Sequence, residues 1–379
     1  MHNPRIAWLL TSAFYYWHPT LSYLAKLFPE MTAFAANWRG YAPGFEDSFK
    51  VEVVGQRKII PVLQSSTSYG SNFTYLPLNI MGRLLRFKPH VIFSNSFGMW
   101  TILALLLKPL GGWKVVIAYE GSSPGVDYRN SPLRLSIRQA MVKSADACIT
   151  NSQAGKAYLI EKLAAPENEV FVQPYEVPAV ASLETQTSDI ESESTPLQKP
   201  IFLFVGGIIP RKGLHHLLEA CAALNRQGCR DYTLQVVGDG AQQAELEDFC
   251  RQHDLTDRVE WVGRVDYAHL GEYFRRADVF VLPTLEDTWG MVVLEAMVLG
   301  KPILCSKWAG AAELIDEGEN GYCFDPHEAE QLARLMRHFI DTPTLAASMG
   351  QKSKQLMAQY TPETAAKFLA DVASFTLRS

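Results

Sequence analysis

The chain has 379 residues, of which 47% are hydrophobic and 20% charged, and its formal net charge is −5. This length accommodates two domains of ordinary size, and the acidic balance argues against general nucleic-acid binding, which favours strongly basic domains. The six cysteines show no CxxC spacing, so the sequence predicts neither a disulfide framework nor a cysteine-rich metal site.

The N-terminal stretch predicts a first strand rather than a signal peptide. Residues 5–10 are apolar after Arg5, and no small-residue cleavage site follows them. The longest charge-free apolar run, residues 101–107, is far shorter than the roughly 20 residues that span a bilayer. We therefore expect a cytoplasmic protein that is soluble or attached peripherally to the inner face of a membrane.

The first half of the chain alternates short apolar runs with segments of helical length, which is typical of an α/β domain. Residues 64–76 are polar and rich in turn formers, so we expect a mobile loop there. The expected strands are residues 6–10, 32–37, 49–54, 90–94, 114–118 and 145–150, and the expected helices are residues 21–27, 78–87, 100–107 and 129–143.

Three features of this half are candidates for a functional site. Glu120 follows a strand in the run YEGSSPG and is either a proton acceptor or a strand-end turn residue. Residues 14–18 are aromatic and end in His18, which suits either stacking on a ligand or a packed interface. Arg134 and Arg138 share a helix face that either meets an anionic lipid or another acidic partner or is simply solvated.

The composition changes over residues 177–200, which are acidic, rich in Ser and Thr and without periodicity. We interpret this segment as a linker. It separates an N-terminal domain, residues 1–176, from a second domain, residues 201–360. A terminal helix, residues 361–379, completes the chain.

The second half opens with a strand at residues 201–205, the turn GGIIPRKG and a helix at residues 214–224. Arg211 and Lys212 in this turn supply charge next to backbone donors, which suits a phosphate group. Further strands are expected at residues 232–237 and 259–263, and further helices at residues 241–253, 328–340, 344–360 and 362–377.

Residues 278–313 form the most informative stretch of the chain. A buried strand, residues 279–282, is followed by the polar turn Glu286-Asp287-Thr288, a helix over residues 290–299 and a strand at residues 303–305. Loops of this kind bind ligands in open α/β sheets. The unpaired amides at a helix start attract anions, and Gly290 lets a ligand approach the backbone closely.

Glu295 lies within the otherwise apolar run MVVLEAMVL, eight positions after Asp287. A helix that is apolar on nearly all faces is buried, and a buried carboxylate needs a hydrogen-bonding partner. That partner is either a ligand hydroxyl, a salt bridge within the core, or water at a helix edge. The spacing allows Asp287 and Glu295 to face one cleft.

A carboxylate, seven residues, Glu-Ala-Met, Gly-Lys-Pro and a glycine-containing turn that ends in Glu313 follow one another here. This order resembles the signature of the retaining glycosyltransferases of family 4, the group 1 glycosyl transferases. The Pro-Arg-Lys-Gly run resembles the same family. The resemblance implies a GT-B fold, in which two Rossmann-like domains face each other across a cleft and the C-terminal helix crosses back to the first domain.

The resemblance also assigns roles to residues. Asp287, or Glu286 one place earlier, would contact the donor sugar, and Glu295 would contact the ribose. The catalytic candidates are Asp287, Glu295 and Glu120; the donor-binding candidates are Arg211, Lys212, Gly263, Arg264, Gly290, Met291, Val292, Glu295 and Gly310. The chain departs from the family pattern at two further places. The first βα loop, residues 11–19, has no glycine, and Gly207 stands where many members have Arg.

The resemblance implies a glycosyltransferase that moves a hexose from a UDP- or GDP-linked sugar to a glycan, lipid or small-molecule acceptor. Polysaccharide, glycolipid or cell-envelope synthesis is the expected setting. No cofactor, metal or nucleic acid is implied, and no DxD-like metal motif stands out. A nucleotide-sugar epimerase of the same fold and a non-catalytic sugar-nucleotide-binding subunit remain alternatives.

Overall fold

The computed structural model describes residues 3–11, 15–63, 65, 67–69, 71–184 and 197–378. The chain forms two compact units. Unit 1 comprises Met1–Ser65, Gly70–Pro178 and Tyr360–Ser379, and unit 2 comprises Ser66–Tyr69 and Ala179–Gln359. In the described part of the chain, no helix combines the length and the apolar character needed to cross a membrane.

Unit 1 is built on a parallel sheet of seven strands in the order β3-β2-β1-β6-β7-β8-β9. Its central strands are buried on both faces, as parallel strands between helix layers are. The strands are β1 (Ile6–Leu10), β2 (Thr32–Ala35), β3 (Lys50–Val53), β6 (Val91–Asn95), β7 (Lys114–Tyr119), β8 (Ala147–Thr150) and β9 (Val170–Val172).

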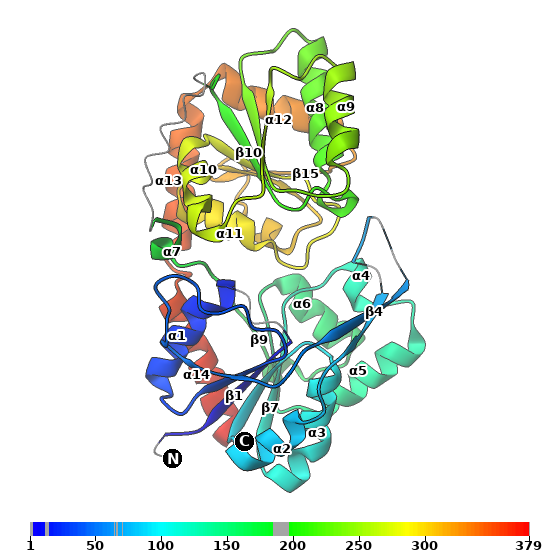
Figure 1. Ribbon diagram of the computed structural model, residues 1–379, viewed down its shortest axis with the longest axis vertical. Helices are drawn as coiled ribbons and strands as arrows, with labels where there is room; N and C mark the ends of the chain where they lie inside the picture. The colour runs from blue at the N-terminus through cyan, green and yellow to red at the C-terminus, as the bar shows by residue number, and fades with distance from the viewer. Residues whose placement is uncertain are drawn as a thin grey trace. The chain divides into compact units, whose positions relative to one another are not determined.

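Helices cover both faces of this sheet (Figure 1). On one face, α1 (His18–Leu27) packs against α14 (Pro362–Arg378), which confirms that the terminal helix returns to the first domain. On the other face lie α2 (Ile80–Phe87), α3 (Met99–Gly111) and α5 (Pro132–Ser144). The shorter elements are η1 (Tyr15–Trp17), α4 (Pro124–Asp127), α6 (Gln153–Ala157), the π-helical turn η2 (Tyr158–Lys162) and η3 (Glu167–Glu169).

The prediction of a loop over residues 64–76 was wrong for its second half. An antiparallel pair forms there between β4 (Lys58–Leu63) and β5 (Ser71–Tyr75), with Lys58 opposite Tyr75. The β-branched and aromatic residues of β5 favour a strand, although polar turn formers surround them. Residues 64, 66 and 70 of the predicted loop lie outside the described residues.

Unit 2 is built on a parallel sheet of six strands in the order β12-β11-β10-β13-β14-β15. Two parallel α/β sheets, one in each unit, confirm the predicted fold class. The strands are β10 (Ile201–Val205), β11 (Thr233–Val237), β12 (Val259–Gly263), β13 (Val279–Leu282), β14 (Ile303–Ser306) and β15 (Gly321–Phe324).

The helices of unit 2 pack their apolar stripes onto this sheet, and α8 and α12 pack on each other (Figure 1). Each leucine that such a stripe buries contributes about 1.5–3 kcal/mol. The helical elements are η4 (Pro210–Lys212), α8 (Leu214–Arg226), α9 (Gln243–Gln252), η5 (Tyr267–His269), α10 (Leu270–Arg276), α11 (Met291–Val298), η6 (Gly310–Leu314), α12 (Ala329–Asp341) and α13 (Thr344–Met357).

The first part of the predicted linker, residues 177–200, is a folded part of unit 2. A short helix, α7 (Val180–Glu184), packs against α10. A Cβ atom on Gly271 would lie 1.7 Å from the carbonyl oxygen of Leu183, so the two backbones touch. Residues 185–196 of the predicted linker lie outside the described residues.

Candidate functional site

The strand order of unit 2 reverses between its two central strands, β10 and β13. The chain runs outward from β10 through β11 to β12, and then returns to β13 on the other side. Open α/β sheets bind ligands at such a switch point, beyond the carboxyl ends of the strands. The loops that follow β10 and β13 carry Arg211, Lys212 and Asp287.

Backbone contacts hold these two loops together. Gly213 has φ +69°, and a Cβ atom there would lie 1.9 Å from the carbonyl oxygen of Pro283. Only glycine therefore fits at this position. The amide of Leu285 donates to the carbonyl oxygen of Arg211 at 2.8 Å, and the hydroxyl of Thr284 donates to the same oxygen at 3.0 Å. The two cations are thereby held against the loop that carries Asp287.

A buried ion pair lies at the centre of the site. Lys212 Nζ donates to Asp287 Oδ2 at 2.6 Å. Burial by itself raises the pKa of Asp287, but the charge and hydrogen bond of Lys212, with help from Arg211 and the amide of Trp289, outweigh burial and bring that pKa below its usual value. Asp287 is therefore ionised at neutral pH and neutralises Lys212.

Glu286 and Asp287 are both buried but face different partners. The carboxylate of Glu286 accepts from the amide of Tyr69, while its carbonyl oxygen accepts from Arg211 Nη1 at 2.7 Å. The carboxylate of Asp287 instead meets Lys212. The side chain beside the candidate phosphate-binding lysine is thus that of Asp287, which favours Asp287 for the first carboxylate role.

Tyr69 is part of this site although it precedes Asp287 by 218 positions. Its hydroxyl donates to Asp287 Oδ1 at 3.3 Å and accepts from the amide of Thr288 at 3.3 Å. Its ring lies 4.0 Å from the guanidinium carbon of Arg211. Burial, followed by the charge of Asp287, raises the pKa of Tyr69 to about 12, so the hydroxyl stays protonated.

The start of α11 faces the same edge of the sheet. Gly290 precedes the helix with φ +98°, and in the described residues no side chain caps the first amides, those of Met291 and Val292. Helix-start amides lack intrahelical partners and favour an anion. Gly310 lies against this loop, because a Cβ atom on it would be 2.3 Å from the carbonyl oxygen of Thr288.

Glu295 is buried on α11, as its apolar surroundings predict. Burial raises its pKa to about 7, and a hydrogen bond with the hydroxyl of Tyr267 moderates that rise. Burial and the charge of Glu295 hold the pKa of Tyr267 well above its usual value. Glu295 therefore has a partner within the protein and titrates near neutral pH.

Gly263 and Arg264 mark the end of β12, at the same edge of the sheet. Gly263 has φ +81°, and its carbonyl oxygen accepts from the amide of Gly238 at 2.8 Å. Arg264 is exposed. Apart from Glu295, which lies within α11, the predicted donor-binding residues thus end or follow strands, or start a helix, at one edge of the unit 2 sheet. Their individual roles stay predictions.

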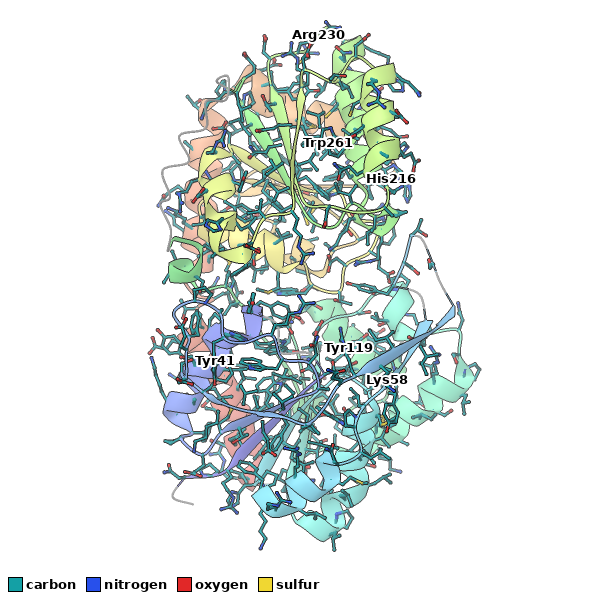
Figure 2. All side chains as sticks on the ribbon, viewed as in Figure 1. Tyr41, Lys58, Tyr119, His216, Arg230 and Trp261 are labelled. Carbon is teal, nitrogen blue, oxygen red and sulfur yellow. The ribbon has the colours of Figure 1, made fainter. Side chains whose placement is uncertain are left out.

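Glu120 is the predicted catalytic residue in unit 1, where it follows the last residue of β7, Tyr119 (labelled in Figure 2). Its charge acts on a second carboxyl, Glu176, which is buried. Burial first, and then the charge of Glu120, hold the pKa of Glu176 well above its usual value. Asn151 Oδ1 accepts from the amides of Tyr175 and Glu176 at 2.9 and 3.2 Å, which fixes the Glu176 loop beside the end of β8.

Buried polar atoms gather at this edge of the unit 1 sheet. Several of them have no hydrogen-bond partner in the described part of the chain, among them Trp17 Nε1, Ser123 Oγ, Thr150 Oγ1, Asn151 Nδ2 and Tyr175 OH. They follow or end β1, β7, β8 and β9. A buried group left unpaired costs about 1–3 kcal/mol, so a polar ligand at this edge would restore stabilising bonds.

Two other candidates from unit 1 have structural roles. Arg138 is buried and donates to the hydroxyl of Tyr158 at 2.9 Å, so neither alternative for its helix face, an anionic partner or solvation, holds for Arg138. The guanidinium carbons of Arg134 and Arg138 lie 4.0 and 4.9 Å from the centre of the Tyr128 ring. His18 is buried, and its Nδ1 accepts from the amide of Ala42 at 2.9 Å. Residues 12–14, which include the first residue of the aromatic stretch, lie outside the described residues.

Across the residues that the structure describes, no group of three or more His, Cys, Asp or Glu side chains has an arrangement that could hold a metal ion.

Two families of known proteins match the chain, one in each half. Residues 20–175 match Glycosyltransferase Family 4, and residues 185–356 match Glycosyl transferases group 1. The crystal structure of HepE from Anabaena in complex with UDP aligns over 98% of this chain and 99% of its own, with a TM-score of 0.73 and 18% identity. That likeness shows the fold.

Curated relatives match over shorter stretches. Alpha-D-kanosaminyltransferase of Streptomyces kanamyceticus is 27% identical over 239 residues, which are 61% of this chain and 61% of the relative. Glycogen synthase of Mycobacterium tuberculosis is 32% identical over 171 residues, or 45% and 41% of the two chains. The chain thus spans between about two fifths and three fifths of the length of these relatives.

Proposed function

Because this chain belongs to the group 1 glycosyl transferases of family 4, which have the GT-B fold, we propose that it transfers a sugar from a nucleotide-diphosphate sugar to an acceptor. The anomeric configuration is retained. The observation that carries the proposal is the Lys212–Asp287 pair at the switch point of unit 2, beside the uncapped start of α11. A lysine, an arginine and helix-start amides together suit a diphosphate.

Each donor-site residue has a task in this reaction. Lys212 and Arg211 bind the diphosphate with the amides of Met291 and Val292. As the bond between the sugar carbon and the phosphate oxygen breaks, these groups stabilise the charge that develops on the leaving diphosphate. Such preorganised electrostatic stabilisation is usually the largest catalytic contribution.

The two carboxylates of unit 2 position the donor. Asp287, held ionised by Lys212, orients the hydroxyls of the sugar. Glu295 accepts from a ribose hydroxyl, for which it must be ionised. Gly263 and Arg264, at the end of β12, contact the base, and Gly310 leaves room for the sugar and phosphates.

Unit 1 binds the acceptor in this proposal. The buried polar atoms without partners at its carboxyl edge suit a ligand with several hydroxyl groups. Glu120 lies at the same edge and takes the proton of the attacking hydroxyl as the new glycosidic bond forms. A glycan or glycolipid acceptor fits this chemistry, in polysaccharide or cell-envelope synthesis. The protein would then work in the cytoplasm, at the inner face of the membrane.

UDP-sugars are the donors to test first, because the structurally similar HepE binds UDP and UDP-glucose. A panel of UDP-, GDP- and ADP-sugars, with and without chelator, would be tested by thermal shift and by donor hydrolysis. A ligand at 100 times its Kd stabilises a protein by about 2.7 kcal/mol. We expect one donor to stabilise the protein and to be hydrolysed slowly with or without chelator.

The other outcomes separate the alternatives. Conversion of the donor into its epimer would favour a nucleotide-sugar epimerase. Binding with neither hydrolysis nor transfer to any glycan or lipid acceptor would favour a non-catalytic subunit. No response to any donor, from a protein shown to be folded, would contradict the proposal.

A further inference from the structure

One face of unit 1 is a continuous layer of three helices. α3 lies between α2 and α5 and contacts both. Leu105 of α3 packs against the core beneath α2 and also against the core beneath α5, so the three helices cover the same side of the sheet. Figure 1 shows them on the side away from α1 and α14. We call the outward surface of these helices the α2–α3–α5 face.

This face carries the most exposed large apolar side chains among the described residues. Leu106, Leu133 and Leu110 are 71%, 72% and 74% exposed, and the next large apolar side chain is only 53% exposed. Leu106 and Leu110 are four positions apart on α3, with Ile102 one turn earlier, so they form one stripe along the helix. Single exposed leucines are ordinary, but a stripe of them marks an interaction site.

The charges of the three helices have one sign. No Asp or Glu occurs in α2, α3 or α5, although the whole chain has a net charge of −5. Their cations are Arg83, Arg86, Lys108, Arg134, Arg138 and Lys143. The neighbouring carboxylate of Asp146 is neutralised by Lys108 at 2.7 Å and by Lys114 at 3.3 Å.

Two cations on this face are available to a partner. Arg86 on α2 and Lys143 on α5 are exposed, and neither forms an ion pair with any residue that the structure describes. They lie on the helices that flank the leucine stripe of α3. The face thus combines an aliphatic centre with positive flanks.

We propose that the α2–α3–α5 face docks on a bilayer that contains anionic phospholipids. Leu106, Leu110 and Leu133 enter the boundary between headgroups and acyl chains, and Arg86 and Lys143 meet lipid phosphates. Apolar insertion and attraction to anionic lipid are the two forces that bind interfacial helices. The proposal rests on the proposed function only for the expectation that the acceptor is at a membrane.

A second copy of the chain fits this face less well. In a symmetric dimer the same patch occurs on both partners, so the positive flanks of one copy would meet those of the other. Like charges in an interface are unfavourable. An anionic bilayer has the complementary sign.

The first experiment is sedimentation of the purified full-length chain with vesicles. One set contains phosphatidylcholine alone, and the other contains phosphatidylcholine with phosphatidylglycerol. We expect binding to the anionic vesicles that weakens as salt is added, because salt screens exposed charges. Equal binding to both sets, or no binding to either, would overturn the proposal.

Two double variants test the face itself. L106D/L110D and R86E/K143E should each lower partitioning onto anionic vesicles at least tenfold. All four side chains are exposed, so each double variant should unfold with a free energy within about 1 kcal/mol of the original protein, about 0.5 kcal/mol per substitution. The matched control is Leu27→Asp on α1, where Leu27 is 50% exposed on the opposite side of the sheet. Unchanged partitioning of L106D/L110D, or an equal loss in Leu27→Asp, would contradict the proposal.

Two further measurements distinguish failure to dock from a damaged donor site and from dimer formation. The thermal shift with a nucleotide sugar, measured without vesicles, should be the same in all these variants, because none of them changes the donor site. Light scattering gives the molar mass of the protein in solution. A dimer that L106D/L110D dissociates, with no vesicle binding, would assign the face to a second copy and overturn the bilayer proposal.

Discussion

Lys212 Nζ lies 2.6 Å from Asp287 Oδ2, and this bond joins the loops that follow the two central strands of unit 2. The side chains are 19% and 10% exposed, so the pair is largely withdrawn from water. Each charge depends on the other, because a lone buried charge is strongly unfavourable. A diphosphate bound to Lys212 would supply part of the negative charge that Asp287 now places beside this lysine. The Asp287 carboxylate would then be able to bind the sugar.

Lys212→Ala should weaken binding of the nucleotide diphosphate by about 1.5–3 kcal/mol, the usual contribution of a hydrogen bond to a charged group. Calorimetric titration with the free nucleoside diphosphate measures this directly. Lys199→Ala is a suitable control, because Lys199 forms an exposed ion pair with Asp278 at the other end of β10. Unchanged affinity in Lys212→Ala would remove Lys212 from the site.

The same variant should also lose stability, by about 3–5 kcal/mol, since Asp287 is left buried without its partner. The double variant K212A/D287N should recover most of this loss, because the amide carries no charge. Urea unfolding of the two variants compares them. If both were equally destabilised, the ion pair would not be the cause.

Glu295 gives donor binding a pH dependence of known sign. Its pKa of about 7 in the free protein means that it is largely protonated at pH 6, whereas a ribose hydroxyl donates best to the ionised form. The Kd for the donor should therefore fall as pH rises toward about 7 and stay constant above it. Glu295→Gln should fold, lose most turnover and show a flat profile. Near-normal turnover in this variant would remove Glu295 from the catalytic set.

The raised pKa of Glu295 also affects stability. It lies above the value of about 4.3 in an unfolded chain, so the folded state holds a proton that the unfolded state releases. The free energy of unfolding should fall by about 3 kcal/mol as pH rises from about 4 to about 7. Glu295→Gln should lack this component, which urea titrations at several pH values would detect.

Local pattern predicted much of this architecture. The stretch from β13 through α11 to β14 follows from one apolar run, one turn, a helix that Gly300 ends and a second apolar run. The burial of Glu295 follows from its apolar neighbours on the helix. The element order of this stretch and the burial of Glu295 both depend on residues that are close in sequence. Hydrophobic periodicity reports on such local relationships.

Contacts between distant residues could not be predicted in the same way. Nothing in the run around Tyr69 marks it as a partner of Asp287, because the pairing depends on how the chain returns after 218 positions. The burial of Arg138 likewise depends on Tyr158, which lies on a later element. Spacing alone showed that Arg134 and Arg138 share a helix face, but which side of that helix the core covers was set by tertiary packing.

Glu176 should behave as a protonated carboxyl. Burial and the charge of Glu120 raise its pKa, so the folded state keeps a proton that the unfolded state loses above about pH 4.3. The free energy of unfolding should therefore decline by about 1.4 kcal/mol for each pH unit over which only the folded state holds this proton. In Glu176→Gln this side chain is neutral at every pH, so the free energy of unfolding should decline less as pH rises above about 4.3, as urea unfolding would measure. Identical pH profiles would contradict a protonated Glu176.

Tyr69→Phe should tighten donor binding. In the free protein the hydroxyl of Tyr69 donates to Asp287 and accepts from the amide of Thr288, so a donor sugar that approaches Asp287 must first break these bonds. Phenylalanine keeps the ring over Arg211 and removes only the hydroxyl. Asp287 is ionised, and a hydrogen bond to a charged group contributes about 1.5–3 kcal/mol, so the Kd should fall by about 10- to 150-fold.

Tyr75→Phe is the matched control for this change, because Tyr75 lies on β5, close in sequence, and is exposed. Calorimetry with the donor identified by thermal shift would compare both variants with the original protein. Tighter binding in Tyr69→Phe alone would mean that the hydroxyl competes with the donor. Weaker binding would mean the opposite, that Tyr69 stays in place and donates to the bound sugar nucleotide, and the competition argued here would be wrong.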